Sequence, residues 1–491
     1  MMSFSLLGVE LIICLWIGVM LIADLLLPPA KKSSLWLLAL AGVAIAGGAL
    51  WTQSQHALWR GLPAALGAAQ AGEIFQDMFI VDPFSSYFKA LFLITAAIVI
   101  LMTREFQAHV PAHLGAFFML LFTALLGTLV LASINDLLIL FLGLELLTFS
   151  LYIMAAYLKT DSRSVEAGMK YLILGSVSSG FLIYGIALLY GFAGGTSFTA
   201  LRAALANTAG PVPLTAQAGL VLLLAGLGFK IAAVPFHLWV PDVYEGAPTP
   251  VVAFLSVGSK MAGVIAMLRV LYGVWLPLHS LWGPMVALVS AATMLYGNLC
   301  AIPQTNIKRL LGYSSIGHAG YLLMGLSTGS VFGVSAVAYY LLAFLVSNLT
   351  VFFVVIIVSE AVGGDLIEHY QGLSTRSPGL AAAMFIGLLS LAGVPPLAGF
   401  VGKLFVLLGT METGRLWLVA LGAVNVAISL YYYLMIVKRM YLDAPRSTAP
   451  IRVHPLAMAT IGVLVVGIAA IGIVQEPFLT RITHIPFAVL R

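Results

Sequence analysis

Long apolar stretches recur along almost the whole chain, and they constrain its fold more than any other feature. Each is about 20 residues long, which is the length that an α-helix needs to cross the hydrocarbon core of a bilayer. Of the 491 residues, 62% are hydrophobic and only 8% are charged, whereas a soluble domain is about 25% charged. The sequence therefore predicts an all-α polytopic membrane protein.

We expect fourteen transmembrane helices, with bounds set by the apolar stretches. They cover residues 6–27, 34–51, 83–102, 113–132, 136–158, 167–193, 217–240, 249–276, 281–301, 309–327, 332–360, 379–410, 416–441 and 455–474. The longest connection, 52–82, is expected to be a surface loop. A second loop, 196–213, is expected to hold one amphipathic turn, and no connection is long enough for a soluble domain.

The basic residues favour an even number of helices. Thirteen Lys and Arg residues fall in one set of alternate loops, whereas five fall in the opposite loops and at the chain ends. Because loops rich in Lys and Arg stay in the cytoplasm, both termini are expected to be periplasmic. The remaining basic residues lie within apolar stretches. Lys89 and Arg269 are near predicted helix ends and are expected to reach the membrane surface, whereas Lys230, Lys260 and Lys403 lie too deep.

The sequence lacks the usual patterns of a cofactor site. Its two cysteines, Cys14 and Cys300, lie in separate apolar stretches, and no Cys or Cys/His spacing suits zinc or an iron–sulfur cluster. No glycine-rich loop joins a strand to a helix, so no nucleotide site is evident. No basic cluster is long enough for a nucleic-acid interface. These observations leave functions that belong to the membrane itself.

The stretch 220–271, LVLLLAGLGFKIAAVPFHLWVPDVYEGAPTPVVAFLSVGSKMAGVIAMLRVL, carries the strongest functional signal. Each of its two apolar spans holds one lysine at mid-span, Lys230 and Lys260, and Pro235 follows the first. A charge at the bilayer centre costs at least about 2.5–3.5 kcal/mol. Proline removes a backbone donor, so we expect helix seven to be broken beside Lys230. A broken helix next to an ionisable group is typical of ion sites in transporters.

Helices four to eight and nine to thirteen repeat this arrangement. In the first set the second helix carries Glu145 and the fourth carries Lys230; in the second set the same helices carry His318 and Lys403. The members of each pair are 85 residues apart. Because five is an odd number of helices, the two units must insert with opposite orientations. We therefore expect an N-terminal three-helix segment (1–112), two inverted repeats (113–276 and 277–442) and a C-terminal part with helix fourteen (443–491).

Glu145, Lys230, Lys260, His318 and Lys403 form the candidate proton path. Burial favours the neutral form of Glu145 and of Lys230, whereas each would stabilise the charged form of the other. Opening and closing a Glu145–Lys230 pair would therefore move a proton. His318, whose unperturbed pKa is about 6.5, would relay it toward Lys403. The alternative is that the Glu–Lys pair is a structural bridge between helices and that His318 only donates a packing hydrogen bond.

Three stretches resemble the subunit N family of bacterial NADH–quinone oxidoreductases, the respiratory complex I: VPFHLWVPDVYEGAPTPVVAFL, QTNIKRLLGYSSIGHAGYLLMG and SLAGVPPLAGFVGKLFV. The resemblance implies fourteen helices, of which seven and twelve are discontinuous. It implies a proton path through a glutamate on helix five, lysines on helices seven, eight and twelve and a histidine on helix ten, which correspond here to the five residues of the candidate path. The histidine on helix eleven of subunits L and M has no counterpart; Ser347 and Asn348 are the nearest polar residues.

The same resemblance implies a translocase subunit of the bacterial inner membrane that binds no cofactor itself. NADH, FMN, iron–sulfur clusters and quinone would be bound by other subunits, and the partners would be the lipid bilayer, the antiporter-like subunit M and small subunits such as K and J. Two other functions remain open on the residues. One is a subunit of a cation/proton antiporter or a membrane-bound hydrogenase, and the other is a structural membrane subunit that conducts no protons.

Overall fold

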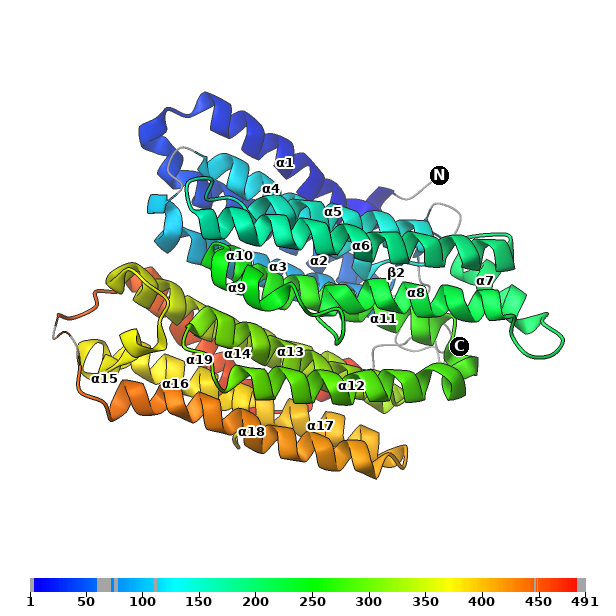
Figure 1. The fold of residues 1–491 in the computed structure, drawn as a ribbon. Coiled ribbons are helices and arrows are strands. Elements are labelled where there is room, and N and C mark those ends of the chain that lie inside the picture. The colour runs from blue at the N-terminus through cyan, green and yellow to red at the C-terminus, as the bar shows by residue number, and fades with distance from the viewer. Residues whose placement is uncertain are drawn as a thin grey trace.

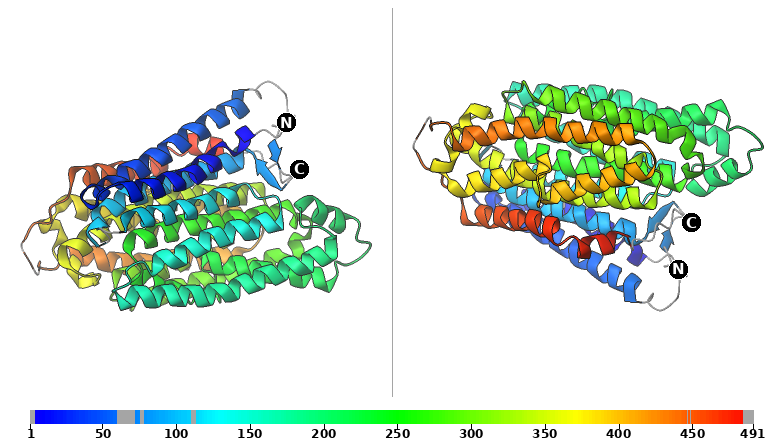
Figure 2. Two further views of the ribbon diagram at one scale, coloured as in Figure 1. Left: turned by 90° about the horizontal axis from the view of Figure 1, so that it is seen from above. Right: turned by 90° about the horizontal axis from the view of Figure 1, so that it is seen from below.

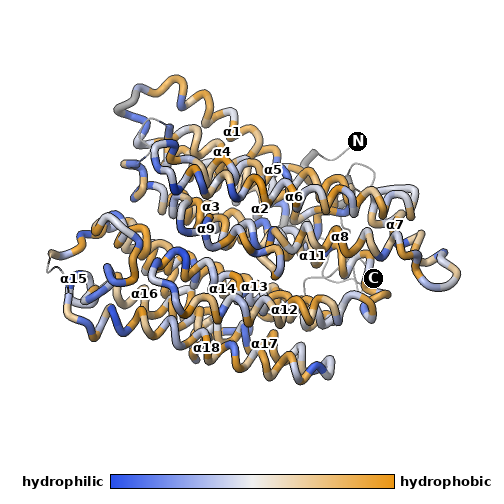
Figure 3. The backbone as a smooth tube through the Cα atoms, viewed as in Figure 1, coloured by the Kyte–Doolittle hydropathy of each residue, from blue (hydrophilic) through white to orange (hydrophobic). Residues whose placement is uncertain are grey.

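The computed structural model describes residues 4–59, 72–74, 78–109, 113–445, 447 and 449–483. These residues form a bundle of long helices that run roughly along one common direction (Figure 1). Hydrophobic residues dominate the length of most helices, and hydrophilic residues gather mainly toward helix ends and connections (Figure 3). This distribution is the one that a lipid environment requires.

Each of the fourteen predicted stretches is helical. The helices are α1 (Gly8–Leu26), α2 (Leu35–Trp59), α3 (Pro83–Phe106), α4 (Leu114–Ala132), α5 (Leu137–Ala155), α6 (Ser162–Ala193), α8 (Leu214–Ile231), α10 (Thr249–Phe254) with α11 (Lys260–Gly273), α12 (His279–Ala301), α13 (Ile307–Leu326), α14 (Val331–Val362), α16 (Pro378–Ala392) with α17 (Ala398–Glu412), α18 (Leu416–Tyr441) and α19 (Pro455–Ile473). Twelve spans are long and apolar enough to cross a membrane among the described residues. The other two are α13 and the broken α16–α17, and the predicted multi-pass fold is confirmed.

Short elements fill the connections. They are α7 (Phe198–Ala206), α9 (Val240–Gly246), α15 (Leu373–Arg376), α20 (Glu476–Thr483) and an antiparallel hairpin of β1 (Gly72–Ile74) and β2 (Phe79–Val81). The amphipathic turn expected in 196–213 is the helix α7. The expected loop 52–82 instead begins with the end of α2 and closes with the hairpin, while much of it lies outside the described residues.

The α10–α11 helix occupies the centre of the bundle and is buried along its whole length. It contacts α3, α4 and α8 on one side and α13 and α14 on the other. The chain up to α8 and the chain from α12 to α18 form two groups of helices around it (Figure 1). α19 returns to pack against α14 and α3, on the same side of the molecule as α1 and α2 (Figure 2). Side chains on α10–α11 are therefore shielded from lipid.

Two helices are interrupted, at the positions predicted for helices seven and twelve. α8 ends at Ile231 and α9 begins at Val240, while α16 ends at Ala392 and α17 begins at Ala398. Each first half is capped by a left-handed residue, Ala232 (φ 66°) and Gly393 (φ 90°), whose amide donates back to the last turn. A cis-proline follows three residues later in both cases, Pro235 and Pro396. The breaks leave backbone carbonyls of the last turn free to accept other donors.

Candidate functional site

Lys230 and Lys403 lie on opposite sides of their helix breaks. Lys230 precedes the left-handed residue Ala232 by two positions and belongs to the last turn of α8. Lys403 follows Gly393 by ten positions and lies in α17, the second half of its broken helix. The breaks are therefore the matched feature of the two halves, and the equal 85-residue spacings do not place the lysines equivalently.

Lys403 caps the end of α16. Its Nζ donates to the carbonyl oxygens of Leu391 and Ala392, each at 2.9 Å. These two carbonyls belong to the final turn, where no later residue of the helix supplies a donor. The side chain is buried, and the ammonium group lies 5.0 Å from the centre of the Tyr321 ring. Neutral oxygens and an aromatic face thus surround the Lys403 ammonium.

Lys230 and Glu145 border one small cavity without forming an ion pair. The Lys230 Nζ donates to the Thr148 hydroxyl at 2.8 Å, and the Ser179 hydroxyl donates to the Glu145 carboxylate at 2.6 Å. No ion pair within 4.0 Å joins the two charged groups, so the direct pair considered from the sequence is open in this structure. The cavity between α5, α6 and α8 offers about 20 Å³ to water, which is enough for one molecule.

Lys260 occupies the centre of the bundle, directly after a π-helical turn. The segment Leu255–Ser259 is π-helical, and such turns often mark functional sites. The Lys260 ammonium donates to both the carbonyl and the hydroxyl oxygen of Ser315 on α13. The Ser315 hydroxyl also bonds the Tyr244 hydroxyl of α9 at 3.0 Å. Lys260 is therefore linked through one serine to a residue beyond the break of α8.

His318 lies one turn after Ser315 on α13, between two tyrosines. Its Nδ1 bonds the Tyr340 hydroxyl of α14 at 2.5 Å, and its Nε2 bonds the Tyr433 hydroxyl of α18 at 3.3 Å. Tyr433 also bonds the Ser314 hydroxyl. Because both ring nitrogens have a hydroxyl partner that is able to donate or accept, either tautomer of the ring is accommodated.

Close helix contacts connect these groups into a series. A Cβ at Gly263 of α11 would lie 3.3 Å from the Lys230 Cβ, so Lys230 packs against the helix turn that follows Lys260. A Cβ at Gly402, next to Lys403, would lie 2.6 Å from the Tyr340 ring, which holds His318. The five predicted residues thus lie in one series across the bundle, in the order Glu145, Lys230, Lys260, His318 and Lys403. Glu145 is half-buried, and the other four are buried.

Comparison with known proteins identifies the family. The family described as "NADH:quinone oxidoreductase/Mrp antiporter, TM" matches residues 134–429. The chain is 45% identical over 395 residues to NADH-quinone oxidoreductase subunit N of Moorella thermoacetica, covering 80% of this chain and 83% of that protein. It is 46% identical over 389 residues to the subunit N of Heliobacterium modesticaldum, covering 79% and 81%.

The chain belongs to the subunit N family of NADH-quinone oxidoreductases. A chain of respiratory complex I from Thermus thermophilus shares the fold with a TM-score of 0.78 and 32% identity, covering 96% of this chain and 98% of that one. The Mrp complex of Dietzia has a chain with a TM-score of 0.83 at 21% identity, which shows a shared fold. The resemblance noted from the sequence is confirmed.

Two basic residues of this subunit N family member lie where the sequence did not place them. Lys89 and Arg269 were expected to reach the membrane surface, and this expectation was wrong, because both are buried. Lys89 forms an ion pair with Glu10 of α1 at 2.7 Å. Arg269 forms an ion pair with Asp82, the residue that caps α3. Partners that are distant in the sequence hold these two cations inside the bundle.

The short helix α9 carries a second group of charges. Asp242 accepts from Lys170 of α6 at 2.6 Å and from Arg309 of α13 at 2.7 Å, and Arg309 also contacts Glu245 at 3.0 Å. Burial raises the pKa of Asp242, but the hydrogen bonds from Lys170 and Arg309 outweigh it and hold the pKa below its ordinary value. These contacts hold α9 against α6 and α13.

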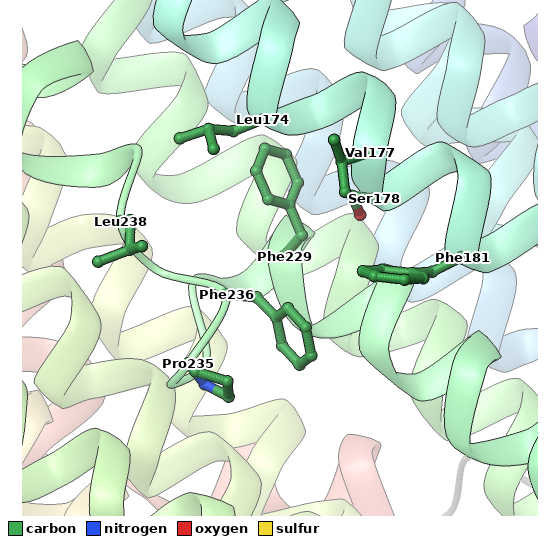
Figure 4. Close-up of a pocket in the computed structure, with 8 residues that line it drawn as sticks. All are labelled: Leu174, Val177, Ser178, Phe181, Phe229, Pro235, Phe236 and Leu238. Atoms are coloured by element: carbon green, nitrogen blue, oxygen red, sulfur yellow. The ribbon is translucent and has the colours of Figure 1, made fainter.

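An apolar hollow opens on the outer surface beside the break of α8. It is lined by Leu174, Val177, Ser178, Phe181, Phe229, Pro235, Phe236 and Leu238 (Figure 4). Phe229 and Ser178 also border the cavity of Glu145 and Lys230, so they separate that cavity from the hollow. Leu238 and Val177 are largely exposed. At this point a single layer of side chains, which includes Phe229 and Ser178, separates the cavity of Lys230 from the outer surface.

Several residues of the site were missed by sequence reasoning. Tyr340, Tyr433 and Tyr244 contact His318 or Ser315, and Thr148 accepts from Lys230. Their only signal is a hydroxyl inside an apolar helix, which many structural tyrosines and threonines share. Ser314 and Ser315, which precede His318 on α13, also join the network.

Proposed function

We propose that this subunit translocates protons across the bacterial inner membrane as part of an NADH–quinone oxidoreductase. Glu145, Lys230, Lys260, His318 and Lys403 carry the protons, with water in the gaps between them. The chain up to residue 112 flanks the path, the segments 113–276 and 277–442 act as inverted repeats around it, and 443–491 completes the bundle. Both termini face the periplasm.

One contrast among the buried cations carries the proposal. Of the six buried Lys and Arg side chains in the described residues, Lys89, Arg269 and Lys308 each form an ion pair with a carboxylate. Lys230, Lys260 and Lys403 hydrogen-bond neutral oxygens instead. A neighbouring carboxylate would be left as an uncompensated buried charge if its lysine lost a proton, which opposes that loss. Lys260 and Lys403 are free of this constraint because their hydrogen-bond partners are neutral. Lys230 lies across a small cavity from Glu145 and is not ion-paired with it.

Redox chemistry belongs to other subunits under this proposal. NADH, FMN, iron–sulfur clusters and quinone would be bound there, and the energy of their reaction would reach this chain through its contacts with neighbours such as subunits M, K and J. The apolar outer faces of α5, α6 and α18 offer room for such contacts and for lipid. Each proton step in this chain needs only a hydrogen-bonded donor and acceptor and a water molecule.

The test compares proton uptake with complex abundance in membrane vesicles. We expect Lys260→Ala to assemble and oxidise NADH but to lose most NADH-driven proton uptake. Lys438→Ala, which removes a lysine near the end of α18, is the control and should behave as the parent protein. If Lys230→Ala, Lys260→Ala and Lys403→Ala all lower assembly while uptake per complex stays normal, the subunit is a structural scaffold and the proposal is wrong. Uptake of sodium instead of protons would favour the antiporter alternative.

A further inference from the structure

The helix α9 lies between the two halves of the bundle and is held by charges on both sides. Lys170 belongs to α6 of the first half, and Arg309 belongs to α13 of the second half. Asp242 accepts one hydrogen bond from each, to its two different carboxylate oxygens, at 2.6 and 2.7 Å. A single carboxylate therefore joins three elements that are otherwise separate in the sequence.

Close backbone contacts leave α9 little freedom to shift. A Cβ at Gly246 would lie 2.4 Å from the Arg163 carbonyl oxygen of α6. A Cβ at Gly312 of α13 would lie 3.3 Å from the Tyr244 Cβ. Both neighbours approach α9 where glycine permits it. The ion pairs and the tight packing thus fix the same short helix against the same two neighbours.

The opposite side of α9 reaches the proton path. Tyr244 follows Asp242 by two residues, and side chains at that spacing point to different sides of a helix. The Tyr244 hydroxyl bonds Ser315, which accepts from the Lys260 ammonium. Tyr244 and the Lys260 side chain are buried, whereas Asp242 is partly exposed. α9 therefore connects a partly hydrated ion-pair group at the helix ends to a lysine at the centre of the bundle.

We propose that Asp242 is a positioning residue, which through Lys170 and Arg309 seats α9 so that Tyr244 holds Ser315 against Lys260. The proposal rests on the proposed function, because it assigns Lys260 a role in proton transfer. Arg309 and Ser315 lie on the same helix, so the ion pair and the serine move together. Loss of the Asp242 charge removes the tie to Lys170 and one of the two carboxylates that hold Arg309. We expect α9 to shift slightly, which lengthens the Tyr244–Ser315 bond and holds Ser315 less firmly against Lys260.

The experiment uses the assembled complex in membrane vesicles and measures NADH-driven proton uptake per complex. Asp242→Asn keeps the size of the side chain and removes its charge, whereas Tyr244→Phe removes only the hydroxyl. Each is expected to lower uptake by about threefold, and the double variant should be no worse than Asp242→Asn alone, because both changes break one connected chain. Asp242→Glu, which keeps the charge, is expected to restore at least half of the uptake.

Asp443→Asn is the matched control. Asp443 pairs with Arg439 at 2.8 Å near the end of α18, as Asp242 pairs with Arg309, but neither residue of this pair belongs to α9 or α13. This variant should leave uptake unchanged, alone or combined with Tyr244→Phe. Normal uptake in Asp242→Asn, or effects of Asp242→Asn and Tyr244→Phe that multiply in the double variant, would overturn the inference.

Failure of this inference differs from failure of the proposed function. If Lys260→Ala abolishes uptake while Asp242→Asn and Tyr244→Phe do not change it, only the positioning role is wrong. If Lys260→Ala leaves uptake normal, the proposed function is wrong. Should Asp242→Asn fail to assemble, Tyr244→Phe decides alone, and normal uptake in that variant contradicts the proposal.

Discussion

Arg269 and Asp82 lie 187 positions apart in the sequence and form a bidentate ion pair inside the bundle. The Arg269 Nη1 donates to Oδ2 at 2.7 Å and Nη2 donates to Oδ1 at 2.8 Å, and Nη2 also reaches the Ala132 carbonyl at 3.1 Å. The pair joins the end of α11 to the start of α3 and the end of α4. It therefore ties the central helix to the N-terminal part of the chain.

Breaking this pair on one side should destabilise the subunit strongly. Removing one partner of a buried ion pair costs about 3–5 kcal/mol, because the other charge is left without compensation. We expect Arg269→Met to lower the amount of assembled complex and its melting temperature. Arg202→Ala, at the surface of α7, is the control and should change neither. Equal stability of Arg269→Met and the parent protein would show that water replaces the guanidinium.

The left-handed residues at the two helix breaks give a second prediction. Ala232 adopts φ 66° although it carries a Cβ, whereas Gly393 adopts φ 90° without one. A left-handed conformation costs an L-residue roughly 1 kcal/mol. Ala232→Gly should therefore raise stability slightly or leave it unchanged, and Gly393→Ala should lower it by about 1 kcal/mol or more, since its Cβ would also lie 3.0 Å from the Lys403 Cδ.

Gly414 separates the two causes of that loss. It has φ 75° and open space around its Cβ position. Gly414→Ala therefore reports the backbone cost alone, and the difference from Gly393→Ala reports the crowding of Lys403. Melting temperatures of the purified complex measure both. If Gly414→Ala and Gly393→Ala cost the same, the contact with Lys403 adds nothing.

The two hydrogen bonds of His318 predict unequal effects of two tyrosine changes. The bond from Nδ1 to Tyr340 is short at 2.5 Å, whereas the bond from Nε2 to Tyr433 is long at 3.3 Å, and hydrogen bonds weaken with distance. Tyr340→Phe should therefore lower NADH-driven proton uptake more than Tyr433→Phe. Tyr441→Phe, at an exposed position of α18, should have no effect. A larger loss of uptake in Tyr433→Phe than in Tyr340→Phe would mean that the bond from Nε2, and not the bond from Nδ1, matters more for proton uptake.

Hydropathy predicts how deep a residue lies, and this was enough for much of the fold and site. The spans, the broken helices and the burial of Lys230, Lys260 and Lys403 follow from apolar length and from proline. The contacts that each lysine makes beside its break did not follow. Lys403 lies in the second half of its helix and caps the first, which depends on how the chain turns after Gly393 and not on composition.

Side-chain partners were the part that the sequence could not supply. Lys89 and Arg269 were assigned to the membrane surface because they are near helix ends, yet Glu10 and Asp82 meet them inside the bundle. These carboxylates come from helices that are adjacent only in the folded chain. The π-helical turn before Lys260 also could not be predicted from the spacing of apolar residues. The span around it is apolar on all sides, so one extra residue in a turn does not change its hydropathy pattern.

The ionisation of Asp242 predicts how the stability of the subunit depends on pH. The pKa of Asp242 is held below its ordinary value of 3.8 by Lys170 and Arg309 despite burial. A carboxyl group with a lowered pKa in the folded state stabilises it above the ordinary value, and this contribution disappears as the pH falls through the lowered value. Asp242 is about one-third exposed, with 33% of its side chain accessible, so we expect only about 1 kcal/mol.

Asp242→Asn should therefore lower the melting temperature of the purified complex by a constant amount between pH 8 and about pH 5. Below about pH 4 the difference from the parent protein should shrink, because the parent then loses the same charge. Asp443→Asn, measured at the same pH values, corrects for the loss of a surface carboxylate near another arginine. A difference that already vanishes between pH 7 and pH 6 would mean that a histidine, and not Asp242, governs the stability of α9, because the unperturbed pKa of histidine is about 6.5.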